Sequence, residues 1–163
     1  MKVLVTTASK HGATEEIAQA IGDALRARGL EVAVLSAEKV GSVEEWDAVV
    51  LGSAVYAGHW LKPAKELVER EAGALAQRPV WLFSSGPVGD PPKPEEDPAD
   101  VVAIVEATRA REHQIFVGKL EKENLSLPER AILKVVRAAE GDFRDFDQIR
   151  AWANGIADAL SGS

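Results

Sequence analysis

The chain has 163 residues, a length typical of one domain, and 46% of them are hydrophobic, which suffices for a buried core. Its 26 acidic and 19 basic side chains give a formal charge of -7, which argues against a general nucleic-acid-binding protein because a phosphate backbone would be repelled. The absence of cysteine excludes disulfides, thiolate metal sites and a cysteine nucleophile, and three widely spaced histidines provide no local zinc motif. No apolar run is long enough for a signal peptide or a membrane-spanning segment, so we expect a cytoplasmic protein.

Strand and helix patterns alternate along the chain. Residues 2–7 are short, β-branched and almost wholly apolar, as in a strand that is buried on both faces of a parallel sheet. Residues 14–28 then carry apolar side chains at helical spacing, and Gly29 supplies the stop. Further strands are predicted over 31–35, 47–53, 79–84 and 114–118, and further helices from Pro63, over about 98–110 and over 147–160. The pattern predicts a doubly wound α/β domain, with one parallel sheet between two helix layers.

Two segments depart from this alternation. Residues 86–98 are rich in proline, glycine and acidic side chains, which predicts an exposed loop. Residues 119–146 are longer than a crossover needs, and within them Ser126 and Glu129 have capping-box spacing ahead of an apolar helical face. We therefore expect a single domain over 1–163 with an inserted segment at about 119–146.

The loop after the first predicted strand has the composition of a phosphate site. Ser9 and Thr14 flank Gly12, which allows a tight turn, and the following helix would present unpaired N–H groups to an anion. The spacing matches neither a dinucleotide fingerprint nor a Walker loop. The alternative is that Thr14 only caps the helix and Ser9 only ends the strand.

Two more loops leave the same edge of the predicted sheet, where ligands of open parallel sheets bind. Residues 52–60 contain two glycines with Tyr56 and Trp60, which suits stacking on a planar ligand, although Trp60 would alternatively anchor the next helix on the core. His59 is either a solvated histidine or a base beside the ligand. Residues 84–90 offer hydroxyls and exposed backbone to the polar edge of a heterocycle, or form an ordinary polar loop.

A phosphate cradle, an aromatic clamp and a polar edge around one crevice are the parts of a flavin mononucleotide (FMN) site. The run Ser9–Thr14, followed by Ala18 and Ile21, resembles the phosphate loop of the flavodoxin-like family. Thr6 and Thr7 stand where that family prefers apolar or aromatic residues. Within the family, the chain is similar to flavodoxin-domain proteins of the menaquinone-dependent protoporphyrinogen oxidase type.

The resemblance implies a flavodoxin-like, doubly wound five-stranded parallel sheet in the order 2-1-3-4-5, with helices on both faces. It also implies FMN as the cofactor, and no catalytic side chain or metal ligand is assigned. The residues expected to bind FMN lie in the three loops, and they are Ser9, Lys10, His11, Gly12, Ala13, Thr14, Ser53, Ala54, Val55, Tyr56, Ala57, Gly58, Ser84, Ser85, Gly86 and Gly89.

Three functions fit this prediction. The first is an FMN-dependent oxidoreductase, with an enzyme similar to protoporphyrinogen oxidase as its specific form, and the second is an electron carrier without a small substrate of its own. The third is a flavin-free binding module of the same fold. The expected partners are a redox protein, a quinone or a small-molecule substrate, and a homodimer is left open.

Overall fold

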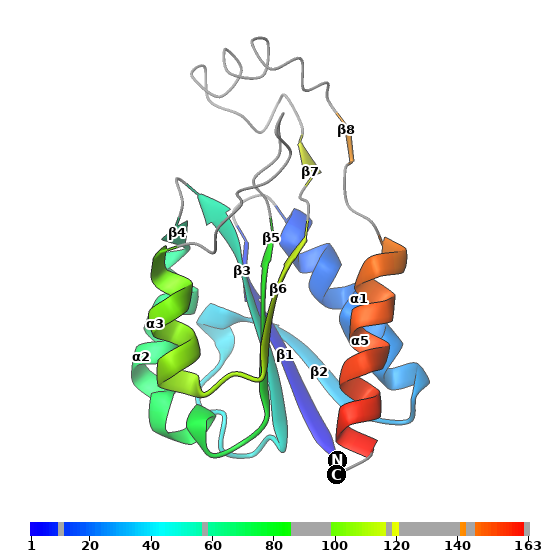
Figure 1. The fold of residues 1–163 in the computed structure, drawn as a ribbon, viewed down its shortest axis with the longest axis horizontal. Helices are drawn as coiled ribbons and strands as arrows, with labels where there is room; N and C mark the ends of the chain where they lie inside the picture. The colour runs from blue at the N-terminus through cyan, green and yellow to red at the C-terminus, as the bar shows by residue number, and fades with distance from the viewer. Residues whose placement is uncertain are drawn as a thin grey trace.

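The computed structural model describes residues 1–9, 12–56, 59–85, 99–116, 119–120, 141–142 and 146–161. Five long strands form the sheet: β1 (Lys2–Ala8), β2 (Glu31–Ser36), β3 (Ala48–Tyr56), β5 (Val80–Ser85) and β6 (Glu112–Phe116). Figure 1 shows α1 (Ala13–Ala27) and α5 (Phe146–Ser161) on one face of this sheet, and α2 (Lys62–Ala76) and α3 (Ala99–Thr108) on the other. The predicted doubly wound α/β architecture is confirmed.

The strand order is β2-β1-β3-β5-β6, with parallel pairing at every step. Counted over the five long strands alone, this is the predicted order 2-1-3-4-5. The order reverses between β1 and β3, so the chain leaves β1 toward α1 on one face and leaves β3 toward α2 on the other. Ligands of such sheets bind at this reversal, outside the carboxyl ends of the strands.

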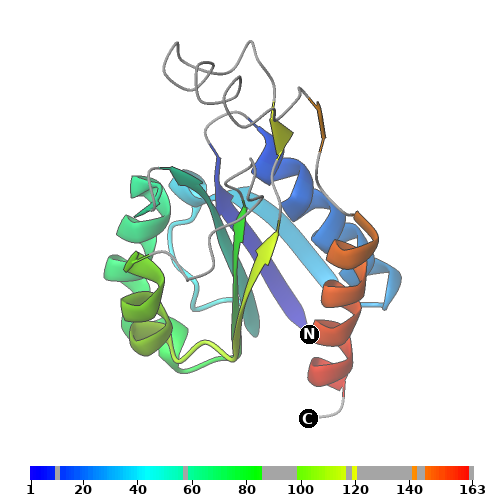
Figure 2. The ribbon, with the colours of Figure 1, turned by 45° about the horizontal axis from the view of Figure 1, so that its top comes forward.

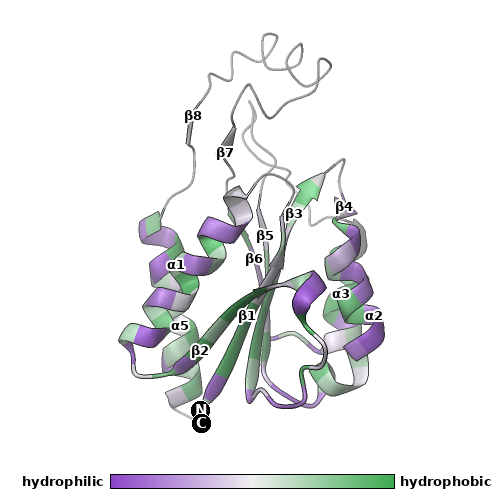
Figure 3. Ribbon diagram, turned by 180° about the vertical axis from the view of Figure 1, so that it is seen from behind, coloured by the Kyte–Doolittle hydropathy of each residue, from purple (hydrophilic) through white to green (hydrophobic). Residues whose placement is uncertain are grey.

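Alternation along the strands supplies two separate cores. Val3 and Val5 of β1 pack against α1 and α5, whereas Leu4 between them packs toward α2 and α3. Because both faces are covered, the strands are apolar throughout, and Figure 3 shows hydrophobic strands between helices whose outer sides are hydrophilic. Among the helices that the structure describes, none is both long enough and apolar enough to cross a membrane.

The end of β3 differs from the prediction. Residues 47–53 were the expected strand, but β3 runs on to Tyr56 and pairs antiparallel with the short β4 (His59–Trp60). Val55 lies opposite Trp60, and Tyr56 lies opposite His59. The predicted aromatic loop is therefore largely a β-hairpin, which we call the β3–β4 hairpin (residues 54–61). A two-residue strand is too short to give a periodic sequence signal.

The end of the sheet that holds the carboxyl ends of the strands also receives the predicted insertion. Its described parts are β7 (Lys119–Leu120) and β8 (Gly141–Asp142), which pair antiparallel above this edge (Figures 1 and 2). The amphipathic helix predicted after Ser126 and the loop predicted over 86–98 lie outside the described residues. The fifth strand, predicted over 114–118, begins two residues earlier, at Glu112, because it pairs with β5 from Trp81 onward. Residues 117 and 118 of the prediction lie outside the described residues.

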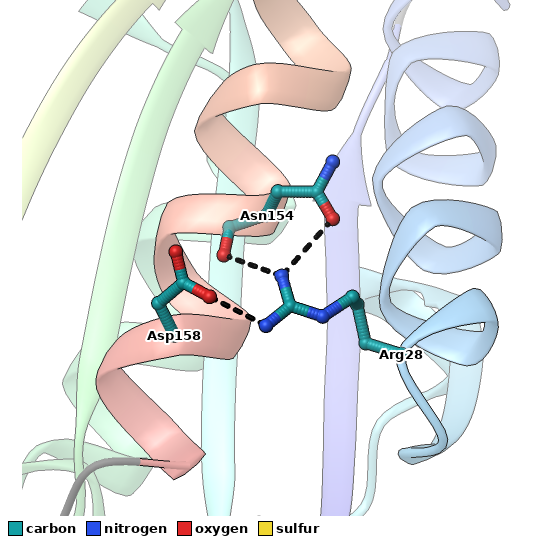
Figure 4. A network of polar contacts seen from close by, with 3 residues as sticks. All are labelled: Arg28, Asn154 and Asp158. Atoms are coloured by element: carbon teal, nitrogen blue, oxygen red, sulfur yellow. Dashed lines mark hydrogen bonds and ion pairs between the residues drawn. The ribbon is translucent and has the colours of Figure 1, made fainter.

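A polar contact joins the end of α1 to α5 (Figure 4). The Arg28 guanidinium donates to the backbone oxygen and to Oδ1 of Asn154, and its second amino group pairs with Asp158 Oδ1 at 2.5 Å. Because these side chains are partly exposed, we expect Arg28→Ala to lower the free energy of unfolding by no more than about 1 kcal/mol. Urea denaturation measures this loss, and Arg150→Ala is the control because its pair with Asp147 lies within α5 alone. An equal loss in both variants would show that the contact between the helices adds nothing.

Candidate functional site at the carboxyl edge of the sheet

The turn from β1 into α1 leaves the start of the helix open to a ligand. Gly12 is the N-cap residue and has a φ of 84°, a left-handed conformation that favours glycine. Its backbone N–H donates to Ser9 Oγ at 2.9 Å, which closes the turn, and no side chain among the described residues caps the helix. Thr14 lies inside the first turn, so the alternative that it caps α1 is wrong. The first backbone N–H groups of α1 and the positive end of its dipole therefore suit an anion.

Two buried hydroxyls lie just ahead of this turn, at the carboxyl end of β1. Thr6 Oγ1 and Thr7 Oγ1 are both buried, and within the described structure neither has a hydrogen-bond partner. Leaving a hydroxyl unpaired in a core costs about 1–3 kcal/mol, so such groups call for an explanation. Alternation along β1 directs Thr7 to the face of α1, where it lines a cavity with Gly12, and directs Thr6 to the other face of the sheet. The unpaired hydroxyl of Thr7 at the end of β1 therefore fits a site that takes a polar ligand.

Ser53 and its neighbours form the second part of the edge. Ser53 is fully buried, and its hydroxyl donates to the backbone oxygen of Ala54 at 2.8 Å and accepts the backbone N–H of Leu61 at 2.9 Å. The hydroxyl thus closes the base of the β3–β4 hairpin. Ala54 and Val55 follow in β3 and are half-buried, and Tyr56 is its last residue.

Trp60 is not a stacking platform. Its side chain is only 2% exposed and packs in the core beneath α2, so the prediction that it stacks on a ligand is wrong and the anchoring alternative is confirmed. Its indole N–H donates to Ser84 Oγ at 2.8 Å. His59, one residue earlier, is exposed.

The last two residues of β5 form the third part. Ser84 is fully buried, and besides the indole of Trp60 its hydroxyl contacts His113 Nε2 at 2.7 Å. Ser85 is the end of the strand and is 5% exposed. The hydroxyl of Ser84 therefore serves contacts inside the protein, which the sequence did not predict.

The sheet brings the described members of the three predicted loops to one edge. Ala8, at the end of β1, lies beside Ser53, and Ser53 lies beside Ser84, so these three residues form one row across the three strands. The predicted residues in the described part are Ser9, Gly12, Ala13, Thr14, Ser53, Ala54, Val55, Tyr56, Ser84 and Ser85. Those outside it are Lys10, His11, Ala57, Gly58, Gly86 and Gly89. Contact of each residue with a cofactor stays a prediction.

Sequence reasoning missed two features of this edge. Thr6 and Thr7 were noted in the sequence only because they differ from the family pattern, and their unpaired hydroxyls were not predicted. Two consecutive threonines at the end of an apolar strand could have indicated buried polar groups there. His113 drew no interpretation, because its contact with Ser84 joins residues 29 positions apart. Nothing local in the sequence indicates such a contact.

A cavity of about 570 Å³ adjoins the turn on the side of β2. Its floor includes Thr7 and Gly12, and one wall is the face of α1 that carries Glu15, Glu16 and Asp23. Among the lining residues that the structure describes, Lys39 is the only basic one. The described lining of this cavity therefore carries more acidic than basic side chains. In the described ranges, no group of three or more histidine, aspartate or glutamate side chains is placed to hold a metal ion.

Comparisons with known proteins agree with this geometry. The chain is 22% identical to "Protoporphyrinogen IX dehydrogenase (quinone)" of Escherichia coli strain K12, over 96% of this chain and 95% of that protein. A solved flavodoxin from the domain Archaea superposes with a TM-score of 0.68 at 16% identity, and 99% of each chain is covered. A flavodoxin variant from Pseudomonas aeruginosa superposes with a TM-score of 0.64 at 19% identity, again over 99% of each chain.

These structural likenesses show the fold, which is that of flavodoxins. The family assignment comes from the Flavodoxin domain profile, which matches residues 4–147 and so spans the turn after β1, the β3–β4 hairpin and the end of β5. This chain belongs to the flavodoxin domain family.

Proposed function

We propose that the protein binds FMN and acts as a redox protein. The observation that carries the proposal is the start of α1, where Gly12 turns the chain in a left-handed conformation and no described side chain caps the helix. This start lies at the strand reversal of a flavodoxin-type sheet, and Thr7, whose hydroxyl is unpaired in the described structure, lines the same cavity as Gly12. The residues present therefore fit a phosphorylated cofactor.

The protein's own residues would bind and orient the cofactor. The backbone N–H groups at the start of α1, with Ser9 and Thr14, would hold the phosphate, while the ends of β3 and β5 would line the flavin ring. A bound flavin supplies the electron or hydride transfer, so no side chain need act as a nucleophile. This agrees with an edge that is rich in hydroxyls and backbone groups.

The acidic cavity beside Gly12 favours FMN over FAD. A dinucleotide would extend a second phosphate and an adenosine beyond the phosphate turn, and the described lining of the adjoining cavity holds three carboxylates and one ammonium group. Repulsion between these carboxylates and a second phosphate would make the binding free energy of FAD less favourable.

We therefore expect FAD to bind at least about tenfold more weakly than FMN, as measured by quenching of flavin fluorescence. Glu15→Lys replaces one carboxylate of the wall by an ammonium group and should reduce the difference in affinity between FMN and FAD. Glu69→Lys, on α2 at the other face of the sheet, should leave this difference unchanged. Equal affinity for FMN and FAD in the parent protein would contradict the assignment.

Between enzyme and carrier, we propose an FMN-dependent oxidoreductase. The support is the similarity to a quinone-dependent dehydrogenase over nearly the full length of both chains. The acceptor would be a quinone and the donor a small reduced molecule such as a porphyrinogen. A carrier would instead exchange electrons with a partner protein. The cytoplasmic location stays a prediction.

The test is to load the purified protein with FMN and to measure its reduction and reoxidation. We expect a yellow protein that bleaches with dithionite and that passes electrons from protoporphyrinogen IX to a soluble quinone. Bleaching without turnover of any small donor would favour the carrier. Protein that stays colourless after incubation with FMN would contradict the proposal and favour a flavin-free binding module.

A further inference from the structure

The hydroxyl of Ser84 joins three elements that are far apart in the sequence. It receives the indole N–H of Trp60 from the end of the β3–β4 hairpin at 2.8 Å, and it contacts His113 Nε2 on the edge strand β6 at 2.7 Å. Ser84 and Trp60 are both buried, and His113 is half-buried. Water therefore does not readily replace either contact.

The chemistry of the three groups limits how the protons can be arranged. An indole N–H can only donate, so Ser84 Oγ must accept from Trp60. The serine proton is then available for His113 Nε2, which accepts it when the imidazole is neutral and carries its proton on Nδ1. In this state the hydroxyl both accepts and donates.

A second proton on His113 disturbs this arrangement. Both ring nitrogens then donate, so Ser84 Oγ faces two donors and the serine proton loses its acceptor in a buried place. The bond that holds Trp60 is thereby linked to the charge of His113.

The described charged residues next to His113 on β6 make contacts of their own. On its own strand, the Arg111 guanidinium lies over the Trp81 ring at 5.2 Å, and Glu112 accepts the indole N–H of Trp152 from α5 on the opposite face. The side chains that α2 and α3 bury on the face of His113 are uncharged, and they include Leu67, Val101 and Ile104. The histidine of the adjoining hairpin, His59, is exposed.

We propose that His113 is a positioning residue for the flavin: through Ser84 it holds Trp60, and with Trp60 the β3–β4 hairpin. This inference rests on the proposed function, because the hairpin carries the expected flavin contacts from Ala54 to Gly58. The second contact that holds the hairpin is made by Ser53, which accepts the N–H of Leu61. Two serines that lie side by side on neighbouring strands thus hold the returning segment of the hairpin, and His113 contacts one of them.

The first experiment uses the purified protein without added flavin. The indole N–H resonance of Trp60, assigned with Trp60→Phe, is followed by NMR from pH 8 to pH 5, together with the imidazole resonances of the histidines. We expect the indole resonance to shift with the titration of His113. The shift should vanish in His113→Gln, which keeps an acceptor but takes up no proton, and it should persist in the control His59→Gln.

The second experiment measures the affinity for riboflavin. Riboflavin has no phosphate, so its binding is free of the phosphate ionisation that would change the charge of FMN near pH 6. At pH 8, His113→Phe and Ser84→Ala should each weaken riboflavin binding by about threefold to tenfold, and His113→Gln should restore most of the loss. The ratio of FMN affinity to riboflavin affinity should stay constant, because the phosphate turn is untouched. Parental affinity should fall toward pH 5, and this fall should be absent in His113→Gln.

The inference would be overturned if the Trp60 indole resonance did not change as His113 titrates, or if folded His113→Phe bound riboflavin with unchanged affinity. Neither result would affect the proposal that the protein binds FMN. If the Trp60 indole resonance shifts with pH as expected but no flavin binds, the proposed function fails. The role of His113 toward a flavin then fails with it. Selective loss of FMN affinity, with riboflavin unaffected, would assign His113 to the phosphate and also overturn the inference.

Discussion

Replacement of Gly52 by alanine is expected to lower the free energy of unfolding by about 2–3 kcal/mol. Gly52 lies in β3 next to the edge that forms the site, and a Cβ built there would overlap the ring of Phe83. That ring has little freedom to move, because it packs against Phe116 and Trp152 with centroid separations of 6.1 and 6.2 Å. In such a closely packed core, the added Cβ would force the ring or the backbone of β3 to move, and this movement costs stability.

Urea denaturation measures the effect, and Gly155→Ala is the matched control. Gly155 lies within α5, and a Cβ there meets nothing within 4 Å. Alanine should therefore raise stability by about 0.5–1 kcal/mol at Gly155, through its higher helix propensity. If both substitutions had the same sign, the account of Gly52 as a packing contact for Phe83 would be wrong.

The second large effect concerns the phosphate turn. We expect Thr14→Ala to weaken FMN binding by about tenfold or more, because hydrogen bonds to a charged phosphate are worth about 1.5–3 kcal/mol each. Thr14 lies in the first turn of α1 with only 2% of its surface exposed. Thr14→Ser keeps the hydroxyl and should retain most of the affinity.

Riboflavin provides the internal comparison for this variant. It lacks the phosphate, so its affinity should be nearly the same in the parent protein and in Thr14→Ala. A parallel loss for FMN and riboflavin would mean that Thr14 supports the fold of the turn and does not contact the phosphate. Isothermal titration calorimetry of the two flavins distinguishes these results.

The architecture was largely predictable from the sequence, because buried parallel strands and amphipathic helices have strong local signals. The run 2–7 and the helix that ends before Gly29 appear in the structure within one or two residues of their predicted bounds. The strand order came from the family resemblance, since periodicity does not determine which strands pair.

The site was predictable only in part. The turn at Gly12 was predicted from local chemistry, because glycine and a following helix leave few alternatives. The roles of Ser53 and Ser84 were not predicted, because a serine in the last part of a strand can face a ligand or close a neighbouring loop. That choice depends on partners such as Trp60 and His113, which tertiary folding alone brings to them.

The central claim is that the phosphate of FMN binds at the start of α1. Its most direct test is the 1H–15N NMR spectrum of the protein with FMN and, separately, with riboflavin. We expect the backbone N–H resonances of Gly12, Ala13, Thr14 and Glu15 to shift strongly with FMN and much less with riboflavin, while residues at the end of β3 respond to both. Equal shifts of the α1 resonances with the two flavins, or none with either, would contradict the account.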